Sequence, residues 1–165
     1  MIRIQGISLF AFLVLAHGAP ALADATVKVS LWDKLGETME MEEALLQADG
    51  RLDVSILPKA LMGITLDQQA VPAGKITFKL ANDSRGMYHE MVVAPLPEGV
   101  AELPFDTTEN RIVEAEAQAL GEGPELAPRT RGEVTLELAA GTYVLFCNLP
   151  GHFASGMWTL LTVTP

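Results

Sequence analysis

Short runs in which apolar and polar residues alternate constrain the fold of this chain most strongly. In residues 75–80, Ile76, Phe78 and Leu80 fall on one face, whereas two lysines and a threonine fall on the other. Alternation with a period of two is typical of a half-buried β-strand. Comparable runs, separated by turn residues, lie at 26–32, 52–56, 62–66, 89–94, 133–138, 142–146 and 158–163. Many short strands joined by turns predict an all-β fold, a Greek-key β-sandwich or barrel.

Several segments between these runs are less regular. Residues 33–50 look more helical than extended, residues 71–74 predict a turn, and residues 82–88 predict a loop. From residue 95 to residue 131 proline and glycine are frequent, and a short helix is expected within 110–120. We therefore expect a single domain over residues 24–165, with a short helical or irregular insertion.

The first 23 residues have the three-part layout of a secretory signal peptide. Arg3 gives a positive start, residues 7–16 form an apolar run, and residues 20–23 end in small side chains. Cleavage is expected after Ala23, with Ala25 as the alternative position. The apolar run is short for a bilayer span, which takes about 20 residues. We expect export to the periplasm without stable membrane insertion; an uncleaved membrane anchor is the alternative.

The mature chain would be strongly acidic, with 10 basic and 21 acidic residues and a formal charge of −11. This balance argues against nucleic acid, whose binders carry basic patches. The sequence contains one cysteine, so no disulfide can form within the chain. A free thiol in an oxidising compartment is open to oxidation unless something occupies it, and a metal ion would do so.

Cys147, His152 and Met157 lie five residues apart in a loop between two predicted strands. Taken singly, each has an ordinary explanation: a buried inert cysteine, a turn histidine and a methionine that fills the core. His89 and His152 are the two histidines of the mature chain, and both lie where a strand meets a loop. Two imidazoles and a thiolate, with a weak axial thioether, describe a blue-copper electron-transfer site. The chain therefore contains one complete set of such ligands.

Residues 141–160 resemble the C-terminal copper loop of the cupredoxins, the plastocyanin–azurin superfamily of blue (type 1) copper proteins. The four-residue gaps on either side of the loop histidine are more similar to those of rusticyanin-type proteins than to those of plastocyanin, in which the first gap is shorter. Residues 82–93 look like the N-terminal ligand strand of the family. The resemblance implies that His89, Cys147 and His152 are equatorial copper ligands and that Met157 is axial. It also implies that Asn82 ties the two ligand loops together through the residue after the cysteine, Asn148.

The chain departs from the family at Glu90, where asparagine is usual, and at Phe146, where plastocyanins have a tyrosine used in a second electron route. We therefore expect electrons to pass through the exposed edge of His152. An apolar collar around that edge suits brief docking of redox protein partners. The expected collar residues are Leu149, Pro150, Phe153 and Met157.

We expect an exported, monomeric protein with one type 1 copper per chain that shuttles single electrons between redox partners. It should not be an enzyme, because a binuclear copper centre needs two cysteines and a trinuclear cluster needs a His-Cys-His motif. The alternative function is a periplasmic copper chaperone or storage protein. Met39 and Met41, with Met62, could then form a second, soft copper(I) site, although core filling and a solvated helix explain them equally well. A structural sandwich with a vestigial site is a third possibility.

Overall fold

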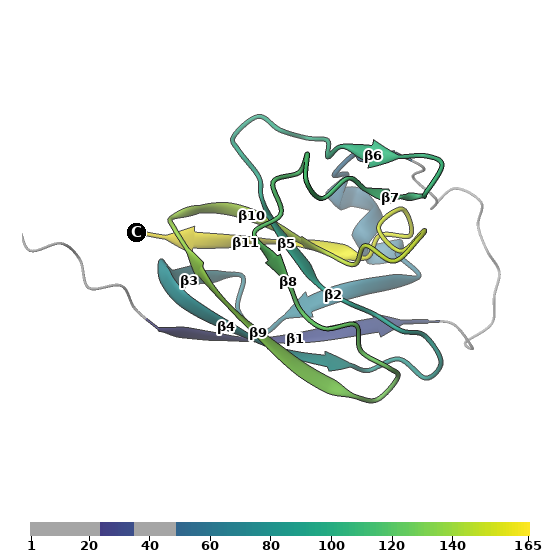
Figure 1. Ribbon diagram of the computed structural model, residues 1–165, viewed down its shortest axis with the longest axis horizontal. Helices are drawn as coiled ribbons and strands as arrows, with labels where there is room; N and C mark the ends of the chain where they lie inside the picture. The colour runs from purple at the N-terminus through teal and green to yellow at the C-terminus, as the bar shows by residue number, and fades with distance from the viewer. Residues whose placement is uncertain (1–23, 35–48) are drawn as a thin grey trace, which may run out of the picture.

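Two β-sheets packed face to face form the body of the protein in a computed structural model that describes residues 24–34 and 49–165 (Figure 1). The first sheet has the order β2-β1-β4-β9 and the second the order β3-β11-β10-β5-β8. The first comprises β1 (Ala25–Asp33), β2 (Met62–Leu66), β4 (Gly74–Asn82) and β9 (Arg131–Leu138). The second comprises β3 (Ala70–Pro72), β5 (Val92–Pro95), β8 (Gly121–Glu122), β10 (Gly141–Phe146) and β11 (Trp158–Thr164). The predicted all-β sandwich is confirmed.

The main core lies between the sheets and follows from the alternation in the sequence. In β4, Ile76, Phe78 and Leu80 are buried, and the residues between them are exposed or half-buried. β4 pairs in parallel with β1 and antiparallel with β9, so its apolar face lies beside those of both neighbours. From the second sheet, Leu145 and Leu161 pack into the same cluster. Burying one face of each sheet is what holds the two layers together.

The second sheet is buried on both faces. Val144, Phe146 and Trp158 belong to a second apolar cluster, separate from the core between the sheets. Leu103 and Ile112 of the 95–131 stretch cover this cluster, and a small hairpin, β6 (Phe105–Asp106) and β7 (Arg111–Ile112), lies within the stretch. Because both faces of this sheet are covered, residues 143–147 are all buried. Strands covered in this way have continuous apolar sequences instead of alternating ones.

Two local predictions are wrong. Residues 52–56 do not form a strand, because residues 54–59 form a 3₁₀ helix, η2 (Val54–Lys59). Asp53 caps this helix by accepting a hydrogen bond from the backbone N–H of Ser55 at 2.9 Å. The helix expected within residues 110–120 is also absent: the segment contains β7 and overlapping hydrogen-bonded turns over residues 114–118. Gln118 ends these turns in a left-handed conformation, with φ of 55°.

Two other segments differ from expectation at their edges. Residues 71–74, expected to be a turn, include part of β3, which pairs in parallel with β11. His89 precedes the regular strand β5 and forms an isolated bridge with Leu126. Three predictions concern residues outside the described ones: the signal peptide at residues 1–23, the role of Met39 and Met41, and the helical character of residues 35–48 within the 33–50 segment. No described helix is long and apolar enough to cross a membrane.

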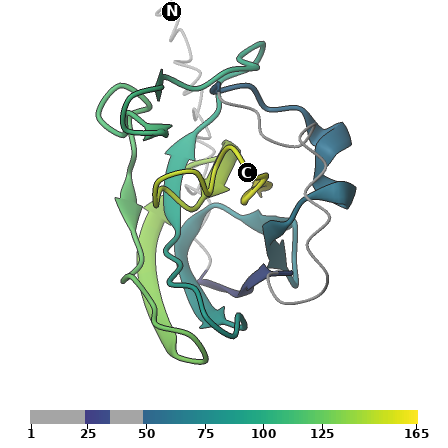
Figure 2. The ribbon, with the colours of Figure 1, turned by 90° about the vertical axis from the view of Figure 1, so that its right-hand side faces the viewer.

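One end of the sandwich gathers the segments that carry the predicted ligands. β1 ends here at Asp33, β4 ends at Asn82 before the loop to His89, and β10 ends at Phe146 before the 147–157 loop. Figure 2 looks onto this end and shows the 147–157 loop lying across it. The fold therefore brings residues from distant parts of the sequence to one place.

Candidate metal centre

The loop between β10 and β11 is closed by its own backbone hydrogen bonds. The N–H of Cys147 donates to the carbonyl of Met157, and the N–H of Met157 donates to the carbonyl of His152, both at 3.0 Å. Gly151 and Gly156 have φ of 82° and 88°, a region that side chains with a Cβ rarely adopt. These bonds and turns fold the loop back so that all three predicted ligands face the sandwich.

Three of the four predicted ligands bring their donor atoms together. Nδ1 of His152 lies 3.3 Å from Nδ1 of His89 and 3.3 Å from Sγ of Cys147. All three donor atoms lie within 4.8 Å of one another. His89 and Cys147 are fully buried, and His152 keeps 7% of its surface exposed. A histidine from before β5 thus meets a cysteine and a histidine that follow it by about sixty residues in the chain.

The spacing and the chemistry of these atoms fit a metal ion. Two imidazole nitrogens that each lie about 2.0–2.1 Å from a shared tetrahedral ion are separated by about 3.3 Å. This is the separation observed between the two Nδ1 atoms. A thiolate with two imidazoles suits copper or zinc, and a thioether is a soft ligand that favours copper.

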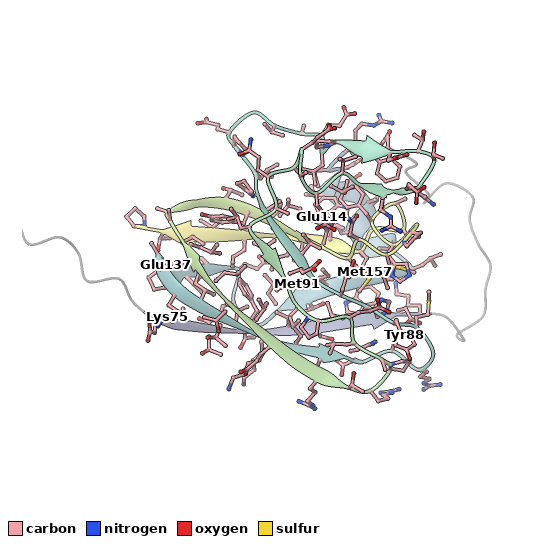
Figure 3. All side chains as sticks on the ribbon, viewed as in Figure 1. Lys75, Tyr88, Met91, Glu114, Glu137 and Met157 are labelled. Atoms are coloured by element: carbon pink, nitrogen blue, oxygen red, sulfur yellow. The ribbon has the colours of Figure 1, made fainter. Side chains whose placement is uncertain are left out.

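Met157, which supplies that thioether, lies at the same end of the molecule (Figure 3). Its side chain is fully buried and belongs to the same core cluster as Cys147. Its backbone is hydrogen-bonded to that of Cys147 and of His152, so residue 157 is held next to these two residues of the loop.

Burial keeps the metal-free donors in their neutral forms. It raises the pKa of the Cys147 thiol to about 12, while the backbone N–H of Glu90, 3.4 Å from Sγ, opposes this rise. Burial, together with the neighbouring His89 ring, lowers the pKa of His152 to about 4. Neutral imidazoles can bind a metal directly, whereas the thiol must release its proton when the metal binds.

Asp33 is a residue of this site that the sequence did not reveal. Its Oδ2 lies 3.2 Å from Nε2 of His89, and the two side chains are 2% and 0% exposed. Burial lowers the pKa of His89, and the Asp33 carboxylate opposes that shift. In the sequence Asp33 marks only the end of a predicted strand, 56 residues before His89. No local signal connects the two residues.

The predicted link from Asn82 to Asn148 is wrong. The side-chain amide of Asn82 donates to the carbonyls of Met87 and Leu126, both at 2.8 Å. Asn82 therefore braces the loop that leads to His89. Asn148 instead accepts from the N–H of Ile112 and donates to its carbonyl, at 2.8 and 3.0 Å. The 95–131 stretch packs against the cysteine loop and engages this amide.

Glu90, which stands where the family usually has asparagine, contributes to the site through its backbone and its charge. Its N–H donates to the sulfur of Cys147. Burial and the nearby Glu122 and Glu114 carboxylates raise the pKa of its side chain, and a hydrogen bond from the backbone N–H of Asn148 works in the opposite direction.

The apolar collar expected around His152 is only partly present. Leu149 is half-buried and Pro150 is exposed, but Phe153 and Met157 are buried in the interior. Tyr88, which the sequence did not single out, is 52% exposed at the same end of the molecule (Figure 3).

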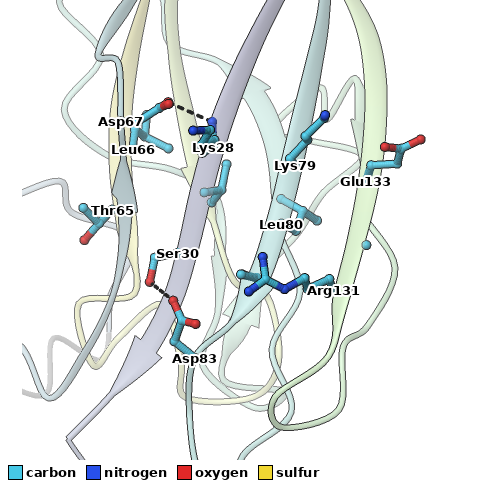
Figure 4. A pocket seen from close by; sticks show the side chains of 13 residues that line it. Lys28, Ser30, Thr65, Leu66, Asp67, Lys79, Leu80, Asp83, Arg131 and Glu133 are labelled. Carbon is cyan, nitrogen blue, oxygen red and sulfur yellow. Dashed lines mark hydrogen bonds between the residues drawn. The ribbon is translucent and has the colours of Figure 1, made fainter.

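A hollow of about 790 Å³ lies away from these residues, against the first sheet (Figure 4). Its lining includes Lys28, Lys79 and Arg131 and none of the four predicted ligands. The candidate metal centre therefore lies outside this hollow.

Comparison with known proteins supports this description. Residues 126–165 match the sulfocyanin (SoxE) domain family, and this segment contains Cys147, His152 and Met157. Auracyanin from the photosynthetic bacterium Roseiflexus castenholzii has a similar structure, with 18% identity, a TM-score of 0.50, and coverage of 88% of this chain and 100% of auracyanin. A search of curated proteins found no match.

Two further solved structures are similar at lower scores. Auracyanin A, a "blue" copper protein from Chloroflexus aurantiacus, is 19% identical, with a TM-score of 0.48 and coverage of 86% of this chain and 99% of that protein. Rusticyanin from Thiobacillus ferrooxidans is 16% identical, with a TM-score of 0.48 and coverage of 84% and 77%. The similarity to the auracyanin from Roseiflexus castenholzii shows that the protein has the cupredoxin fold. Within this fold, His89, Cys147 and His152 bring together the two imidazoles and the thiolate of a type 1 copper ligand set, and Met157 lies in the same loop as Cys147 and His152.

Proposed function

We propose that the protein is an exported electron carrier that binds one type 1 copper ion and shuttles single electrons between redox protein partners. His89, Cys147 and His152 would be the equatorial ligands and Met157 the axial ligand. Residues 24–165 would be the mature domain, produced by cleavage of a signal peptide at residues 1–23. The protein would have no catalytic activity of its own.

The convergence of the three donor atoms within 4.8 Å carries this proposal. Copper would supply a one-electron redox couple at this end of the sandwich. The buried donors are held by strand ends and loop hydrogen bonds, so the same ligand positions can serve both oxidation states. A site that needs little rearrangement is suited to electron transfer, and less suited to releasing its metal.

Two features support export and docking. The layout of residues 1–23 is that of a secretory signal, and the single thiol would be protected by a metal in an oxidising compartment. His152 is the one equatorial ligand with measurable exposure, and Leu149 and Pro150 flank it in the loop. A partner that contacts this edge would approach the copper most closely, and the acidic chain would favour a basic partner.

Addition of Cu(II) to the purified mature domain tests the copper site. We expect an intense visible thiolate-to-copper charge-transfer band that is absent in Cys147→Ser. Ser155→Ala, a change in the same loop that removes only a hydrogen bond to Gly151, is the matched control and should keep the band. A colourless wild-type protein, or a band that survives Cys147→Ser, would refute the proposal.

The rate of copper release separates a carrier from a chaperone or storage protein. A carrier should lose its copper to an excess of chelator slowly while it exchanges electrons rapidly with a small redox reagent. Release as fast as electron exchange would favour copper handling. The segment that favours that alternative, with Met39 and Met41, lies outside the described residues.

A further inference from the structure

A buried carboxylate stands behind one of the proposed copper ligands. Asp33 ends β1, which is paired with β2 on one side and β4 on the other. Met62 of β2 lies opposite Asp33, so the backbone of Asp33 is held within the sheet. Oδ2 of Asp33 lies 3.2 Å from Nε2 of His89, and neither of these two side chains is more than 2% exposed. The pair is therefore a fixed, dry contact.

This contact determines which nitrogen of His89 carries the proton. A neutral imidazole has one N–H, and a carboxylate can only accept. Nε2 must therefore carry the hydrogen to bond Asp33, and Nδ1 is left with a free lone pair. Nδ1 is the atom that faces His152, 3.3 Å from the Nδ1 of that ring. Outer partners that orient a metal-binding histidine in this way raise its basicity and fix its ring.

The charge of the carboxylate also acts on the metal. Copper(II) with one thiolate has a net charge of +1, and reduction by one electron from a redox protein brings it to zero. A fixed negative charge stabilises the more positive state more strongly. Because the surroundings are dry, this interaction is screened far less than one at the surface.

We propose that Asp33 is a positioning residue of the copper centre, which holds His89 with Nδ1 toward the metal and favours Cu(II) over Cu(I). This inference rests on the proposed function. A purely structural role for Asp33 would change the stability of the protein but would alter neither the proton position on His89 nor the reduction potential.

The first test needs no copper. Nitrogen NMR of the metal-free mature domain reports which ring nitrogen of each histidine is protonated. We expect the proton of His89 on Nε2 in the wild type, and also in Asp33→Asn, where the amide oxygen still accepts. In Asp33→Leu, which has a similar volume and no acceptor, we expect a mixture of the two tautomers. A wild-type proton on Nδ1, or an unchanged tautomer in a folded Asp33→Leu, would overturn the positioning role.

The second test measures the midpoint potential of the copper-loaded protein. Asp33→Asn keeps the acceptor and removes the charge, so the absorption band should remain while the Cu(II) preference falls at least tenfold. This is a positive shift of at least about 59 mV for one electron. Asp83→Asn is the matched control, because Asp83 lies at the same end of the first sheet but is exposed and bonds Ser30. It should leave the potential unchanged.

A potential in Asp33→Asn equal to that of Asp83→Asn would overturn the electrostatic role. If the protein bound no copper, the proposed function would fail at that step. The NMR result would still decide how Asp33 orients His89, so the two failures are distinguishable.

Discussion

The thiol of Cys147 should be nearly unreactive in the metal-free protein. Burial raises its pKa from 9.0 to about 12. At pH 8 a thiol with pKa 9.0 is about one-tenth thiolate, whereas one with pKa 12 is about one part in ten thousand. Because the thiolate is the nucleophile, alkylation should be about a thousandfold slower than in the unfolded chain.

Alkylation by iodoacetamide measures this directly, because the chain has one cysteine. The same protein unfolded in urea is the reference. Shielding of a fully buried sulfur also slows the reaction. With shielding alone the thiol would keep a pKa of 9.0, so the alkylation rate would stop rising above about pH 9. A raised pKa makes the rate climb about tenfold per pH unit beyond pH 9 for as long as the protein stays folded. A plateau near pH 9, or a rate within about tenfold of the unfolded chain, would refute the reasoning.

The same shift links the stability of the metal-free protein to pH. The folded thiol keeps its proton to a higher pH than the unfolded thiol. Its contribution to the free energy of unfolding is therefore fully present below pH 9 and is lost between pH 9 and about 12. A shift of three pH units corresponds to about 4 kcal/mol. Urea unfolding across this range should show the free energy of unfolding falling more steeply with pH in the wild type than in Cys147→Ala. Parallel pH profiles for the two proteins would contradict the raised pKa of the thiol.

Three substitutions test the frame of the site by urea unfolding of the metal-free protein. Gly156→Ala would place a Cβ 2.7 Å from that of Ala60 at φ of +88°, and should cost roughly 1–3 kcal/mol. Asn148→Ala removes the bonds to both backbone groups of Ile112 and should cost about 2–4 kcal/mol, since buried groups lose their partners. Phe78→Ala empties a fully buried site and should cost about 3–5 kcal/mol. A change below about 0.5 kcal/mol would contradict the corresponding contact.

Much of the fold was predictable because it depends on local alternation. Residues 62–66 and 75–80 alternate cleanly and lie in β2 and β4. The prediction failed for 52–56, where an aspartate cap and a proline favour a helical turn over a strand. It also failed within 110–120, where packing against the second sheet and a left-handed Gln118 replace the expected helix by turns.

The identity of the proposed ligands was readable from residue type and number. One cysteine, two mature histidines and a methionine at regular spacing leave a single way to assemble the ligand set. Their meeting point was implied by the positions of His89 and Cys147 where predicted strands meet loops. The two sheets then place the donor atoms within 4.8 Å of one another.

The sequence by itself determined the all-β class and the chemistry of the donors, because alternation and residue type are local properties. Only the tertiary structure decided the surroundings of those donors. It placed Asp33 behind His89, directed Asn148 to Ile112 instead of Asn82, and buried part of the expected collar. These contacts join residues far apart in the chain, so they depend on how the strands and the long 95–131 stretch pack. Burial then sets the proton affinities of the thiol and the imidazoles, which residue type alone does not define.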